Sequence, residues 1–122
     1  MVCVATWRFA IGISKLKYIE KLHCSDNCKI DNVNHLKNTL KILNCSYTCG
    51  IDQNGISELQ YIEEIYCSNN NKINNVNHLK NTLKILHCSH ICGIDQNGMR
   101  SNLALCARHF RFKIYRSVGL RP

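Results

Sequence analysis

Apolar residues recur along this chain with a period of 21 or 22 residues, marked by the dipeptide Cys-Ser at positions 24, 45, 67 and 88. Within a period, buried-type and polar residues alternate over a few positions, as in Leu22-His23-Cys24. An alternation with a period of two predicts a short β-strand with one face in the core. A second apolar group, at positions 30, 33 and 36, recurs every three residues and predicts a 3₁₀-like turn. In the alternate coils, glycines such as Gly55 and Gly98 are expected to allow tight turns, with Ile51 and Ile56 pointing inward.

The sequence also repeats itself at an offset of 43 residues. Residues 19–55 and 62–98 are identical at 28 of 37 positions, so two copies of a 43-residue unit are present, each made of two coils. Because no coil of this length can bury its own apolar face, neighbouring coils must stack, with their strands paired in parallel. We place the four coils at residues 19–39, 40–61, 62–82 and 83–99.

The first and third coils resemble the leucine-rich repeat, L-x-x-L-x-L-x-x-N-x-L, with one residue inserted before the last apolar position and cysteine in place of the third leucine. The second and fourth coils continue into Cys-Gly-Ile-Asp-Gln-Asn-Gly and look like the cysteine-containing subtype. They depart from it at Thr48 and Ile91, where that subtype has Asn or Cys. The alternation of the two coil types over about residues 12–99 resembles leucine-rich repeat proteins of giant viruses of the mimivirus group.

This resemblance implies an α/β-type repeat solenoid, with short parallel strands on a concave face and 3₁₀ or loop returns on the convex side. It also implies an intracellular protein, in the host cytoplasm if the chain is viral. The interior should hold a structural ladder whose amides bond backbone groups and whose small thiols fit a narrow core. The ladder residues are Asn27, Asn70, Cys24, Cys45, Cys67 and Cys88. In contrast, Cys49 and Cys92 are expected beyond the turn and more reactive, and His35 and His78 on the solvated convex side.

Both ends of the chain depart from the repeat. Residues 1–18 are interpreted as a degenerate half coil with residues 2–5 as its strand, and residues 100–122 as a basic degenerate tail. The tail carries +6 of the net charge of +8. Neither end supplies a convincing cap, so a nonfunctional remnant of a longer array is one interpretation. We expect no membrane contact, since no apolar run approaches the ~20 residues of a membrane helix, and the N-terminus does not look like a signal peptide.

The two units differ mainly at positions predicted to face outward along the strands. Aromatic and imidazole side chains there are good anchors for another protein, although exposed positions also drift without selection. We therefore predict a protein-binding role for this face, with an unidentified partner. Parallel stacking of the strands should line these side chains up in rows across the coils. The candidate binding residues are His23, Asn44, Tyr66 and His87 in one row, Asp26, Tyr47, Asn69 and His90 in the next, and the apolar Ile42 and Ile85.

Other chemistries are less well supported by the sequence. Cysteine pairs with three residues between them could hold zinc, but the two members of each pair are expected on different sides of the turn, and in the third coil Asn71 replaces the second cysteine. We therefore expect no metal or cofactor. No carboxylate is fixed beside a Cys–His pair, so neither catalysis nor a small-molecule substrate is expected. The tail interleaves arginine with aromatic residues, which makes nucleic-acid binding the alternative function.

Overall fold

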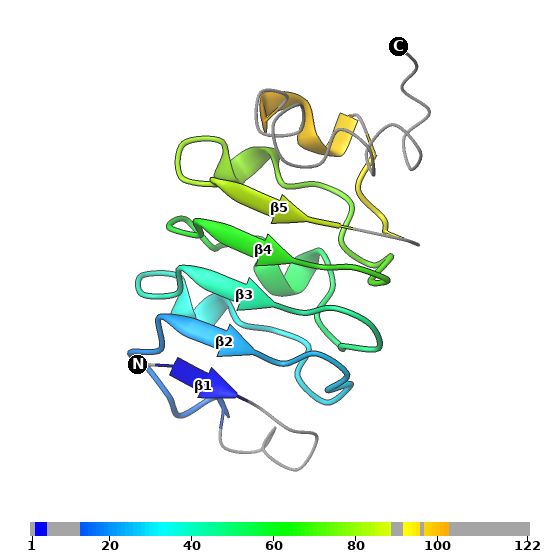
Figure 1. Cartoon of the computed structure of the whole chain (residues 1–122). Coiled ribbons are helices and arrows are strands. Elements are labelled where there is room, and N and C mark those ends of the chain that lie inside the picture. The colour runs from blue at the N-terminus through cyan, green and yellow to red at the C-terminus, as the bar shows by residue number, and fades with distance from the viewer. Residues whose placement is uncertain (1, 5–12, 89–91, 96, 103–122) are drawn as a thin grey trace.

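The computed structural model describes residues 2–4, 13–88, 92–95 and 97–102. In this part of the chain, five short strands form one parallel sheet whose strand order follows the chain order (Figure 1). The strands are β1 (Val2–Val4), β2 (Lys21–His23), β3 (Ile42–Asn44), β4 (Glu64–Tyr66) and β5 (Ile85–His87). The predicted strands at the repeated Cys-Ser sites are thereby confirmed, and so is the strand expected near the N-terminus.

A short 3₁₀ turn follows each of the strands β2 to β5 in the described part of the chain. These turns are η2 (Asn34–Leu36), η3 (Asn54–Ile56), η4 (Asn77–Leu79) and η5 (Asn97–Asn102). The apolar spacing of three had predicted η2 and η4, whereas η3 and η5 fall in coils for which only tight turns were expected. Parallel strands joined by such turns are compatible with a repeat solenoid. Among the described residues, no helix is long and apolar enough to cross a membrane.

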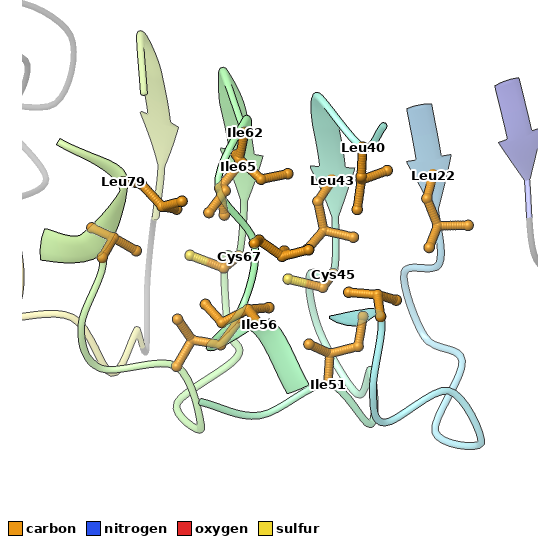
Figure 2. Packing of buried hydrophobic residues seen from close by; sticks show 14 of the residues in the cluster. Leu22, Leu40, Leu43, Cys45, Ile51, Ile56, Ile62, Ile65, Cys67 and Leu79 are labelled. Carbon is orange, nitrogen blue, oxygen red and sulfur yellow. The ribbon is translucent and has the colours of Figure 1, made fainter. Parts of the chain in front are cut away.

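One continuous apolar core runs through the stack, between the sheet and the return segments (Figure 2). The middle residue of each strand from β2 to β5 points into it and is buried. These residues are Leu22, Leu43, Ile65 and Leu86. From the return segments, Ile51 and Ile56 pack into the same core, as their spacing predicted.

Adjacent coils are hydrogen-bonded to each other beyond the sheet as well as within it. At the start of β3, the amides of Lys41 and Ile42 both donate to the carbonyl of Glu20 in the preceding coil. On the return side, the amide of Val33 donates to the carbonyl of Gly55 at 3.0 Å. The second unit repeats this contact between Val76 and Gly98 at 2.7 Å. The backbones of neighbouring coils therefore stay close on both sides of the core.

The glycines of the return segments are required by this close approach. Gly55 and Gly98 were expected to permit tight turns, but neither has a left-handed φ. A Cβ atom on Gly55 would instead overlap the carbonyl of Asp31 in the neighbouring coil, and one on Gly98 would overlap the carbonyl of Asn74. Because the obstacle is backbone, it cannot rotate aside. These glycines set how tightly the coils stack.

We expect Gly55→Ala to lower the free energy of unfolding by at least about 1–3 kcal/mol, because the added methyl group must push two coils apart. Chemical denaturation followed by circular dichroism measures this change. The exposed Gln60 lies five residues later, and Gln60→Ala should stay within about 0.5 kcal/mol of the parent. Equal stabilities for the Gly55 variant and the parent would contradict the stacking argument.

Candidate functional site

The outward side chains of the strands line up in two rows across the sheet. One row contains the last residue of each strand, so that His23 lies beside Asn44, Asn44 beside Tyr66, and Tyr66 beside His87. This is the row predicted from the coil spacing. The other contains the first residue of each strand, Lys21, Ile42, Glu64 and Ile85, in the same order. Side chains that are 21 or 22 residues apart in the sequence are thus neighbours on one face of the sheet.

A shallow hollow of about 290 Å³ lies on this face over β2, β3 and β4. Both rows contribute to its wall. The lining residues are Lys21, His23, Ile42, Asn44, Glu64 and Tyr66. Four of these were predicted binding residues, whereas Lys21 and Glu64 were left out of that set. The hollow therefore carries one basic and one acidic side chain on either side of the apolar Ile42.

Tyr66 is held in place within the hollow by two contacts. Its hydroxyl donates a hydrogen bond to a carboxylate oxygen of Glu64 at 2.9 Å, and its ring lies 5.7 Å from that of His87, tilted by 33°. The hydrogen bond to the Glu64 carboxylate raises the pKa of the Tyr66 phenol. The tyrosine thus stays neutral and presents a fixed, half-buried ring, which suits packing rather than acid–base chemistry.

Two of the predicted binding residues also take part in coil-to-coil hydrogen bonds. The amide oxygen of Asn44 accepts from the hydroxyl of Ser25 at 2.7 Å and from the backbone amide of Ser46 at 3.2 Å. The carboxylate of Asp26 accepts from the hydroxyl of Thr48 at 3.1 Å. Asn44 and Asp26 therefore stabilise the contact between neighbouring coils, which was not predicted from the sequence. This structural role accounts for the presence of both residues without a bound partner.

The next predicted row, Asp26, Tyr47 and Asn69, lies in the turn that follows each strand and has a left-handed backbone, with φ of 61°, 65° and 60°. Aspartate and asparagine tolerate this conformation, because their short side chains bond locally. The tyrosine side chain cannot form such local hydrogen bonds, yet Tyr47 occupies the same position and is 50% exposed. None of the three lines the hollow. The fourth member of the row, His90, lies outside the described residues.

The buried amides of the structural ladder are where the sequence placed them. The amide nitrogen of Asn70 donates to the carbonyl of Cys45 at 2.8 Å and to that of Ile51 at 3.1 Å, both in the preceding coil. Its oxygen accepts from the backbone amide of Lys72 at 3.1 Å. Asn27 is equally buried, and its oxygen accepts from the amide of Lys29. Both were predicted to be buried and bonded to backbone, and this is confirmed.

The cysteines follow the prediction only in part. The four ladder cysteines are buried in the core, as expected. Cys49, predicted to lie beyond the turn, is instead fully buried, with its sulfur 3.6 Å from that of Cys24. Coil spacing missed this contact because it joins residues of two different coils. Cys92 is half-buried and Cys28 is exposed, while His35 and His78 are exposed as expected.

Within the described ranges, no group of three or more Cys, His, Asp or Glu side chains is arranged to hold a metal ion. Comparison of the chain with protein-family models, with curated proteins and with solved structures finds no match. The function must therefore be argued from the sheet face itself.

We expect Asn70→Ala to lower the free energy of unfolding by about 1–3 kcal/mol, because two buried carbonyl groups would lose their donor. Thermal and urea denaturation measure the change. Asn71 is the next residue along the chain and is exposed, so Asn71→Ala is the matched control and should leave stability nearly unchanged. Similar losses for the two variants would show that Asn70 has no special place in the ladder.

Thiol labelling of the native protein should separate the cysteines by burial. Among the cysteines whose burial the structure describes, Cys28 should react first, since it is exposed, and Cys92 next, while Cys24, Cys45 and Cys49 should react only through transient opening. Isotope-coded alkylation with peptide mapping gives the rate for each position. A fast reaction at Cys49 would contradict its burial.

Proposed function

We propose that the chain is a non-catalytic leucine-rich repeat protein that binds a protein partner on the outer face of its strands. Three features support the repeat class: the coil spacing of the sequence, the parallel stack of strands with 3₁₀ returns, and the buried asparagines bonded to backbone of adjacent coils. Repeat proteins of this kind use the extended surface that stacking creates to bind other macromolecules.

The observation that carries the proposal is Tyr47. A left-handed backbone costs a bulky residue about 1–2 kcal/mol, and the equivalent positions of two other coils hold Asp and Asn, which avoid that cost. The Tyr47 ring is half exposed, so the core does not repay the strain. Strained backbone conformations are concentrated at functional positions. Tyrosine is also common among the few residues that contribute most of the binding energy in protein interfaces.

The hollow over β2, β3 and β4 indicates the chemistry of the partner. Ile42 and the ring of Tyr66 offer apolar area, whereas Lys21 and Glu64 offer one charge of each sign. A partner segment with an apolar side chain flanked by an acidic and a basic residue would match all four. Such a contact should depend mainly on packing and only modestly on salt, because opposite charges at the rim contribute more to orientation than to affinity.

Replacing Tyr47 separates binding from folding. Tyr47→Asn should raise the free energy of unfolding by about 1 kcal/mol, since asparagine accepts the left-handed backbone, and should at the same time weaken partner capture. The reverse change, Asn69→Tyr, should lower stability by a similar amount. Denaturation curves and a pull-down from the native source measure the two effects. A Tyr47→Asn variant that is no more stable than the parent would remove the strain on which the proposal rests.

The pull-down should compare the parent with Tyr47→Asn/Tyr66→Ala, with Tyr61→Ala and with a chain lacking residues 103–122. Tyr61 is an exposed tyrosine that does not line the hollow, so its loss should leave capture unchanged. We expect the double variant to lose the partner at both about 0.1 M and about 0.5 M salt. The Debye length is ~10 Å at the lower concentration and roughly half of that at the higher one, so charge–charge attraction is screened much more strongly at 0.5 M. Capture that survives the double variant but disappears with the tail and with rising salt would favour nucleic-acid binding instead.

A further inference from the structure

A second feature of the molecule involves cysteines that the proposed function does not use. The sulfur atoms of Cys24 and Cys49 lie 3.6 Å apart, close enough for one thiol to donate a hydrogen bond to the other. Cys24 directly follows β2 in the first coil, and Cys49 lies in the turn of the second coil. The contact therefore joins two neighbouring coils across the core.

The repeat places an equivalent contact in the second unit. An offset of 43 residues carries Cys24 onto Cys67 and Cys49 onto Cys92, and interaction with Cys92 raises the pKa of the Cys67 thiol. The second unit differs in one respect, because the pKa of Cys92 is lowered by interaction with Cys88 as well as with Cys67. Both pairs keep their cysteines through a duplication in which other core positions vary, as Leu22 and Ile65 do.

We propose that Cys24 and Cys49 form a dithiol site that a peroxide oxidises to a disulfide, which locks the first coil to the second. The 3.6 Å separation lets the two sulfur atoms approach bonding distance by small side-chain rotations. The bond would fix the spacing of β2 and β3, whose residues line one side of the hollow. This proposal stands on the sulfur contact and does not depend on the identity of any partner.

The electrostatics of the pair assign a role to each sulfur. Hydrogen bonding with Cys24 lowers the pKa of Cys49 below its ordinary value, and the positive charge of Lys72 acts in the same direction while burial opposes it. The ammonium of Lys72 is held beside Cys49 by a 2.5 Å bond to its carbonyl oxygen. Cys49 thus supplies the thiolate, and Cys24 supplies the thiol that resolves the intermediate.

The reaction balances with hydrogen peroxide as the oxidant. The Cys49 thiolate attacks one peroxide oxygen; an S–O bond forms, the O–O bond breaks, and the departing hydroxide takes a proton to become water. The Cys24 sulfur then attacks the sulfenic acid of Cys49; the S–S bond forms, the S–O bond breaks, and the second hydroxide leaves as water with the proton of Cys24. Two thiols are oxidised, and one peroxide is reduced to two molecules of water. Peroxide is small enough to reach the buried pair through local opening.

The test treats the reduced, full-length protein with hydrogen peroxide under native conditions, then blocks free thiols and maps cross-linked peptides by mass spectrometry. We expect a mass loss of about 2 Da for each disulfide and a linkage between Cys24 and Cys49. The melting temperature should rise by about 5–10 °C, because the bond closes a loop of about 26 residues, and dithiothreitol should reverse the rise. Absence of this linkage in the oxidised protein would overturn the proposal.

Two variants distinguish the proposed pair from its neighbours. Cys28→Ser removes the exposed thiol nearest in sequence to Cys24, and the linkage and the melting shift should both persist. Cys49→Ala should abolish both, and circular dichroism checks that this variant is folded. Pairing of Cys24 with Cys28 in the parent would count against the site. The same linkage is expected between Cys67 and Cys92; a Cys88–Cys92 bond in its place would limit the proposal to the first unit.

Discussion

The spacing between neighbouring coils is the constraint on which the rest of the structure depends. Parallel strands must lie ~4.8 Å apart to share hydrogen bonds, and in this chain the return segments are bonded from coil to coil as well. Gly55 and Gly98 meet the backbone of the neighbouring coil without room for a side chain. The buried amide of Asn70 satisfies carbonyl groups of the preceding coil that no strand pairing reaches. A few residues at the joints between coils thus determine whether the stack forms.

The same spacing creates the sheet face. No single coil contains the proposed binding surface, because each strand contributes only two outward side chains. Stacking brings Lys21, Ile42 and Glu64 into one row and sets Tyr66 against His87 in the other. Opposite charges, an apolar side chain and a fixed aromatic ring then surround one hollow. The charge and apolar area of the hollow depend on the order of the coils along the chain. The same side chains in another coil order would give a different surface.

Coil spacing also explains the thiol pairs. A narrow interior favours small side chains, and cysteine fills that space at the end of each strand from β2 to β5. In the first unit a second cysteine, Cys49, enters from the turn of the next coil, and its sulfur lies 3.6 Å from that of Cys24. The packing of the core therefore determines which thiols can be oxidised to a disulfide. The feature that makes the core compact also brings two oxidisable groups within reach of each other.

The sequence by itself determined the elements and the core. Strands, 3₁₀ turns at Asn34–Leu36 and Asn77–Leu79, inward leucines and buried asparagines all follow from apolar spacing within one coil, repeated in the next. The row from His23 to His87 could also be predicted, since the strands of equal coils stack in register. Only the tertiary structure decided the burial of Cys49, the role of the glycines, the place of Lys21 and Glu64 in the hollow, and the strained backbone of Tyr47. The physical reason is that these features depend on contacts between residues of different coils or on the path of a turn, which the local alternation of polar and apolar residues does not encode.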